Sequence, residues 1–132
     1  MYARAAAAYR RVYLESASPS RIVDELFCRL LSDCEEAAAL MGAGDLSGKG
    51  SALGHALAIV DELSASLDAE AAPDLCGNLA RLYDYVRGRL IAANLRLEPR
   101  LLDEAERVVR VLREAFHAAA PQATPQATME RP

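Results

Sequence analysis

The residues of this chain that could do chemistry are its carboxylates, three cysteines and two histidines. Four adjacent pairs stand out among the carboxylates: Asp24-Glu25, Glu35-Glu36, Asp61-Glu62 and Asp103-Glu104. Neighbouring residues on a helix diverge by about 100°, so the two members of a pair do not converge on one substrate. The sequence also has no Glu-x-x-His motif of the kind that holds two metals in a helical bundle. We therefore expect solvated helix faces, with no catalytic site, no metal and no cofactor.

The cysteines are Cys28, Cys34 and Cys76. An odd number without a Cys-x-x-Cys motif is not the pattern of a disulfide framework or a zinc site. We expect reduced thiols in a cytosolic protein. Cys34 falls in an apolar stripe and is predicted to lie in the core. Cys28 falls on the opposite side and is predicted to be the more reactive thiol.

Two further patterns resemble known sites but lack their key residues. The glycine-rich segment 42–51 has Ala43 where a phosphate-binding loop needs glycine, and Gly50 where it needs serine or threonine. A link between antiparallel helices explains this segment better. His55 lacks the lysine and glycine that typically follow the histidine of a phosphotransfer module.

Composition limits the class of protein. A chain of 132 residues is long enough for one domain with a real core. Apolar residues make up 52% but aromatic residues only 5%, a balance that favours helices over sheet. A net charge of −4 argues against a nucleic-acid binder. No run of about 20 apolar residues is present, so we expect no membrane insertion. The segment 5–8 is too short for the apolar part of a signal peptide.

The elements that must position these residues are helices. Apolar residues recur every three or four positions in four segments, 19–41, 51–67, 74–97 and 99–119. Short links between them force neighbouring helices to run antiparallel. The predicted fold is therefore all-α, an antiparallel four-helix bundle with a short N-terminal helix or arm.

The predicted bundle occupies residues 18–119, between a tyrosine-bearing arm at 1–17 and a tail at 120–132. The tail carries a doubled Pro-Gln-Ala-Thr run without an apolar stripe, so we expect it to be disordered. Asp74 is predicted to cap the third helix of the bundle.

The third predicted helix has two different sides. Leu79, Tyr83 and Leu97 belong to its broad apolar stripe. Tyr85 lies well off that stripe, with an arginine one helical turn away on either side. Its ring is either shielded by the arginine stems or available to a partner, and the residues alone leave both interpretations open.

The second predicted helix has an apolar stripe wider than one core needs. Leu63 belongs to the ordinary stripe, whereas Ile59 widens it. An exposed apolar edge can mark a docking groove for a partner helix. The alternative is that Ile59 packs at the margin of the helix.

The arm presents Tyr2, Tyr9 and Tyr13 on one helical side. One interpretation is a strap that packs on the bundle. The other is a reversible cover over a groove, or a direct contact with a partner, because a tyrosine ring can bury apolar area while its hydroxyl stays at a wet rim.

Several landmarks resemble one family in order and spacing. They are an Ala-Ser-Pro entry at 17–19, Leu26-Phe27, Asn78-Leu79, Leu82-Tyr83-Asp84-Tyr85, Arg89-Leu90, Ala93-Asn94 and Leu112-Arg-Glu-Ala-Phe116. Together they are similar to the flagellar secretion chaperones of the FliS family over roughly residues 2–117. The chain departs from the family pattern at Cys28, where an acidic residue is usual, and at Phe116, where tryptophan is common.

The resemblance implies a cytosolic export chaperone. Such a protein binds the C-terminal segment of flagellin, prevents premature polymerisation, and delivers it to the flagellar type III export apparatus by docking on an export gate protein. The resemblance implies neither a small-molecule substrate nor a nucleic-acid partner. A chaperone for another secreted client, or a plain helical adaptor, is the alternative.

We select as candidate partner contacts a set of apolar, aromatic and amide residues from the arm and from the stripes. These residues are Tyr9, Tyr13, Ile22, Ile59, Leu63, Leu67, Leu79, Tyr83, Tyr85 and Asn94.

Overall fold

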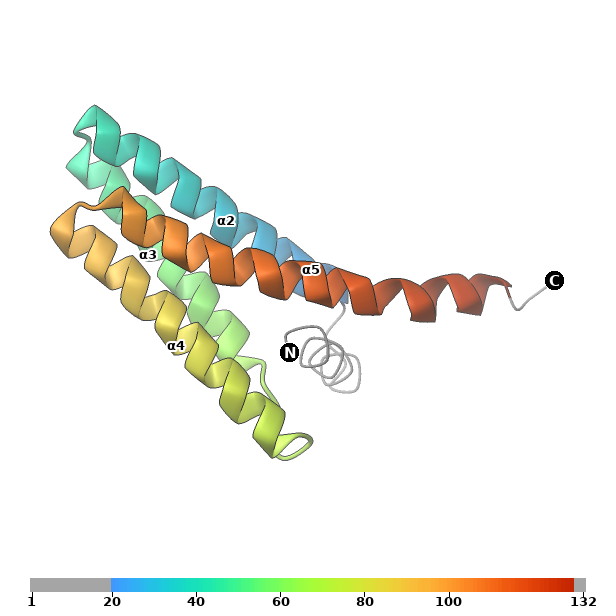
Figure 1. Cartoon of the computed structure of the whole chain (residues 1–132). Helices are drawn as coiled ribbons and strands as arrows, with labels where there is room; N and C mark the ends of the chain where they lie inside the picture. Colours follow the sequence, from blue (N-terminus) through green and yellow to red (C-terminus); the bar gives the residue numbers. More distant parts are fainter. Residues whose placement is uncertain (1–19, 130–132) are drawn as a thin grey trace.

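The computed structural model describes the backbone of residues 20–129 and the side chains of residues 21–117. Within that part the chain forms four helices and no strand: α2 (Ser20–Ala43), α3 (Leu46–Ala65), α4 (Pro73–Arg96) and α5 (Pro99–Met129). Figure 1 shows them side by side as a bundle, which confirms the all-α fold. The predicted arm, with Tyr9 and Tyr13, lies outside the described residues. No described helix combines the length and hydropathy needed to cross a membrane.

Each helix packs against two others, in the order α2–α3–α4–α5 and back to α2. All four contribute leucines, valines or alanines to one continuous buried cluster. Within this cluster the rings of Phe27 on α2 and Phe116 on α5 meet edge to face, with centroids 6.1 Å apart and an interplanar angle of 80°. Both rings are almost fully buried, so this pair ties the first helix of the bundle to the last.

The link between α2 and α3 is much shorter than the predicted 42–50, because α3 begins at Leu46. Gly44 takes a left-handed φ of 77°, which a glycine adopts without steric cost and which ends α2. The carboxylate of Asp45 then accepts a hydrogen bond of 2.9 Å from the N–H of Gly48. This cap satisfies one of the free donors at the start of α3, so the glycine-rich stretch enters the helix.

Both ends of α4 differ from the prediction, at Asp74 and at Leu97. Pro73 occupies the first turn and Ala72 the capping position without a side-chain hydrogen bond, so Asp74 lies inside the helix and is not its cap. At the other end Leu97 adopts a left-handed φ of 56° and its N–H bonds to the carbonyl of Ala93 at 2.8 Å. That turn takes Leu97 off the apolar stripe and leaves it 47% exposed.

Helix α5 continues to Met129, although the sequence predicts an end at 119 and a disordered tail over 120–132. Figure 1 shows its last turns projecting beyond the other helices. A helix that has already formed can lengthen without a second nucleation cost, because each added residue contributes one backbone hydrogen bond. Alanine and glutamine, which recur in this segment, are good helix formers. Pro121 and Pro125 each lack the N–H that would continue the ladder.

The two cysteines of α2 lie as their positions on the helix predict, and the third, Cys76, lies on α4. Cys34 is fully buried, and burial raises the pKa of its thiol to about 12. Cys76 is also buried, which raises the pKa of its thiol. Cys28 is half-buried and is the most accessible of the three thiols, which confirms its predicted place off the stripe; its greater reactivity stays a prediction.

Candidate partner-binding site

Four of the predicted contact residues lie in the core of the bundle. Ile59 is 5% exposed, and Leu63, Leu79 and Tyr83 are exposed by 2% or less. The alternative for Ile59, packing at the helix margin, is the one that the structure favours. A partner could reach these four side chains only if the bundle opened.

The other described candidates lie on the surface but do not form one patch. Ile22 and Tyr85 are 46% and 44% exposed, and Leu67 and Asn94 are half-buried. Because the helices run antiparallel, Ile22 and Leu67 lie toward the end where α2 begins and α3 ends, and Asn94 lies at the opposite end. Tyr85 is midway along α4. The four exposed or half-buried candidates therefore occupy separate positions on the bundle.

Asn94 already has a partner within the bundle. The ammonium of Lys49, the only lysine in the chain, donates to the side-chain oxygen of Asn94 at 2.5 Å and to its backbone oxygen at 3.3 Å. Lys49 is 8% exposed, an unusual burial for a lysine. These bonds hold the first turns of α3 against the end of α4, which gives Asn94 a structural role.

Tyr85 is held in place by an arginine, as its helical spacing predicts. The guanidinium carbon of Arg89 lies 5.5 Å from the centre of the Tyr85 ring, within the range of a cation–π contact. The same guanidinium donates to the carboxylate of Glu104 on α5 at 3.2 Å. Arg81, the other predicted neighbour, instead donates to the side chain of Asn78.

A groove of about 270 Å³ opens beside this tyrosine, between α4 and α5. We call it the Tyr85 groove. It is lined by Leu82, Tyr85, Glu104, Arg107 and Val108. Its walls are apolar apart from Glu104, which is paired with Arg89, and Arg107, which is exposed. This arrangement suits an apolar side chain with a charged neighbour.

A second groove of about 260 Å³ lies between α2 and α5 and is more highly charged. Its lining includes Leu31, Arg113 and His117. At its edge Asp24 on α2 accepts a hydrogen bond of 2.9 Å from Nε of Arg113 and contacts Nε2 of His117. We call these three residues the Asp24 cluster. Its ion pairs link the start of α2 to α5.

The Asp24 cluster should make stability depend on pH. Burial raises the pKa of Asp24, but hydrogen bonds from Arg113 and His117 lower it more, so its net pKa lies below the ordinary 3.8. A depressed pKa stabilises the folded state above the unfolded pKa, and this contribution disappears as the pH falls through the folded value. The Asp24→Asn variant should therefore melt below the wild type near pH 6, and the difference should shrink below about pH 4. Thermal melts followed by circular dichroism measure it.

Asp33, also on α2, serves as a control because its pKa is shifted in the opposite direction to that of Asp24. Burial raises the pKa of Asp33 above its ordinary value, so its charged form opposes folding. The Asp33→Asn variant should be the more stable protein near neutral pH and lose that advantage as the pH falls. Parallel pH trends for the two variants would contradict the assigned role of Asp24.

Four exposed leucine and isoleucine side chains are not among the predicted contacts. Leu95 is 77% exposed, Leu46 56%, Leu97 47% and Ile91 42%. Ile91 and Leu95 are four residues apart on α4 and lie outside its buried stripe. This spacing, which places both side chains on one exposed face of the helix, is the sequence signal for them. Leu46 was missed because it was assigned to the link before α3.

The described residues contain no group of three or more histidine, cysteine or acidic side chains arranged to hold a metal ion. The two grooves are lined by apolar and charged side chains, which suit recognition of side chains of a partner.

Comparison with known proteins assigns the chain to a family. Residues 1–123 match the family model described as flagellar protein FliS. The chain is 36% identical over 122 residues to the flagellar secretion chaperone FliS of Salmonella typhimurium, covering 89% of this chain and 90% of that protein. It is 31% identical over 119 residues to the Vibrio cholerae FliS chaperone, covering 87% and 88%, and 36% identical over 109 residues to the Pseudomonas aeruginosa chaperone FliSB, covering 79% and 86%. The chain belongs to the FliS family of flagellar secretion chaperones.

Proposed function

We propose that this protein is a cytosolic export chaperone for flagellin. It binds the C-terminal segment of flagellin, prevents premature polymerisation, and delivers the client to the flagellar type III export apparatus. The observation that carries the proposal is the match to relatives named as flagellar secretion chaperones over most of both chains. The family resemblance of the landmarks on α2, α4 and α5 supports the choice of flagellin as client.

The bundle suits a client that is apolar and unfolded before export. Such a segment can lie along a helical bundle as amphipathic helices, with its apolar side chains in grooves. Ordering the segment costs free energy, so the contact must extend over a large area. Two grooves on different faces, together with the exposed leucines, supply separated contact points for one long segment.

The test is a calorimetric titration of the full chain with the C-terminal segment of flagellin from the same organism. We expect binding tighter than about 100 μM. A peptide of the same composition in scrambled order is the control. A well-folded protein that does not bind the native segment at this concentration would contradict the proposal and favour another secreted client or an adaptor role.

We further propose that the arm, residues 1–17, covers a client groove in the free protein and that the loaded complex docks on an export gate protein. A chain without residues 1–17 should bind the flagellin segment equally or more tightly, because a closed cover lowers the apparent affinity. Lost binding would make Tyr9 and Tyr13 direct contacts. Co-purification of the gate protein with the loaded but not the free chaperone tests the docking step.

A further inference from the structure

The Tyr85 groove contains an aromatic side chain that is already fixed for binding. Arg89 lies over the Tyr85 ring and is itself anchored on Glu104 of the neighbouring helix. The ring nevertheless remains 44% exposed. A side chain whose orientation is set before association loses little conformational entropy when a partner arrives. Tyr85 is therefore suited to act as an aromatic anchor in an interface.

The apolar part of the groove has room for a small hydrophobic ligand group. Leu82 and Val108, both half-buried, line it together with the ring of Tyr85. A cavity of about 150 Å³ accommodates a benzene molecule, so a groove of about 270 Å³ accepts one or two apolar side chains.

The groove carries one positive charge that the described residues leave unpaired. Arg107 lines the groove, is exposed, and forms no ion pair within the described part of the chain. Among the described residues that line the groove, Glu104 is the only carboxylate, and it is already paired with Arg89. A partner that places a carboxylate beside its apolar side chain would complement this charge.

Charge also distinguishes between the possible occupants of the groove. The chain's own N-terminal segment 1–19 carries three arginines, Arg4, Arg10 and Arg11, against Glu15 alone. The unpaired charge of Arg107 would repel that basic segment. An acidic partner is therefore a better match than the arm.

We propose that the Tyr85 groove is a docking subsite for an amphipathic, acidic helix of the exported client. One apolar side chain of that helix sits among Leu82, Tyr85 and Val108. A carboxylate three or four positions away, which lies on the same face of the client helix, pairs with Arg107. This proposal rests on the proposed chaperone function and specifies the chemistry of the client at one site.

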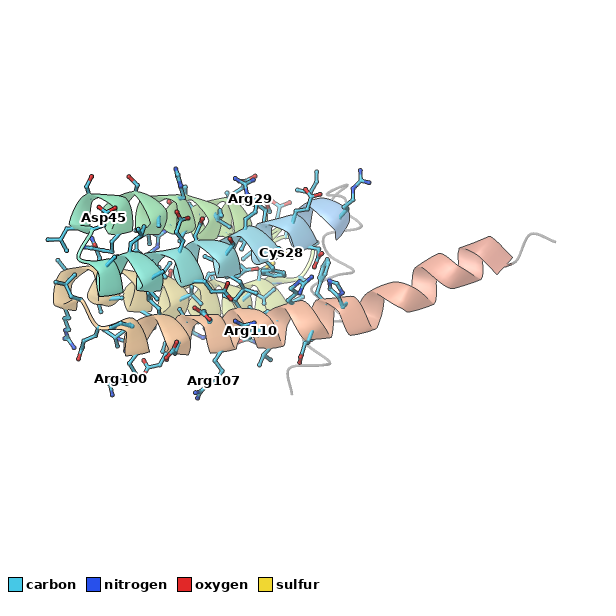
Figure 2. The ribbon with its side chains drawn as sticks, turned by 90° about the horizontal axis from the view of Figure 1, so that it is seen from above. Cys28, Arg29, Asp45, Arg100, Arg107 and Arg110 are labelled. Carbon is cyan, nitrogen blue, oxygen red and sulfur yellow. The ribbon has the colours of Figure 1, made fainter. Side chains whose placement is uncertain are left out.

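The test compares client binding by three variants of the full chain, with the flagellin C-terminal segment as the probe. Tyr85→Ala should weaken binding about tenfold, as expected for a central aromatic contact. Arg107→Glu should weaken it about three- to tenfold and reduce its salt dependence. Arg29→Glu is the matched control, because Arg29 on α2 makes the same charge change and points away on the opposite side of the bundle in Figure 2, where Arg107 projects from α5. It should change binding less than twofold.

A second arm of the test changes the client. In the changed flagellin segment, asparagine and glutamine replace the aspartates and glutamates. The neutral segment should bind the wild-type protein more weakly than the native segment does. The Arg107→Glu variant should bind the neutral segment at least as tightly as it binds the native one. That pattern would show that the charges pair directly.

The outcomes separate this proposal from the general function. If the wild type binds the segment but Tyr85→Ala and Arg107→Glu bind it within twofold of wild type, the docking subsite is wrong and the chaperone function stands. Equal losses for Arg29→Glu and Arg107→Glu would also overturn it, because the effect would then come from net charge. A change of oligomeric state in Tyr85→Ala at unchanged client affinity would assign the groove to a second copy of the chain instead. Absence of wild-type binding overturns both proposals.

Discussion

Replacement of Phe27 by alanine should lower the free energy of unfolding by about 3–5 kcal/mol. The Phe27 side chain is fully buried and its ring meets that of Phe116 edge to face. Alanine would remove the ring and leave a cavity between α2 and α5 that the packed helices cannot close. Urea denaturation followed by circular dichroism measures the loss.

The matched control is Phe27→Leu, which keeps most of the apolar volume but removes the aromatic pair. It should lose clearly less than the alanine variant, since an edge-to-face pair contributes about 0.5–1.5 kcal/mol beyond the buried area. A loss below about 1 kcal/mol for Phe27→Ala would contradict the buried, closely packed position of this ring, because large-to-small changes in a packed core cost more.

The number and order of the helices could be predicted because the apolar period persists over long segments. In α2 and α4 the stripes extend for many turns, and the observed ends of these helices differ from the predicted ends by only one or two residues. The buried cluster consists largely of residues from these stripes, including Cys34. Periodicity is a strong signal when it is long, and it also fixes which face points inward.

The start of α3 could not be predicted because it depends on contacts beyond local propensity. Glycines are poor helix formers, so the stretch before Ser51 favoured a loop. The structure overrides this preference with the Asp45 cap and with the bonds from Lys49 to Asn94, forty-five positions further along the chain. No local pattern indicates the second of these.

The candidate site was harder to predict than the fold because core residues and docking residues share the same apolar pattern. Leu63 and Leu79 lie in stripes that a partner groove would also require, and both are buried in the bundle. Tyr85 could be selected correctly as a surface residue because it lies off the stripe. Charge on a neighbouring helix, such as Arg107 beside Tyr85, becomes visible only when α5 is placed against α4.

Replacement of Asn94 by leucine should lower the free energy of unfolding by about 1.5–3 kcal/mol, the usual contribution of a hydrogen bond to a charged group. The Lys49 ammonium would keep only the longer bond to the backbone oxygen of residue 94 in a site where little water reaches it. Chemical denaturation measures the loss. Client affinity measured on the folded variant should not change, because the side-chain oxygen of Asn94 is already bonded to Lys49.

The double variant Lys49→Met with Asn94→Leu separates the hydrogen bond from the packing. Replacing both partners by apolar side chains removes the buried charge together with its acceptor, which can be nearly neutral, whereas removing only the acceptor leaves the charge unsatisfied. The double variant should therefore be more stable than Asn94→Leu alone, and the coupling energy of the cycle reports the Lys49–Asn94 contact. If the two changes were simply additive and Asn94→Leu weakened client binding without lowering stability, Asn94 would be a client contact and its place at the end of α4 would serve recognition.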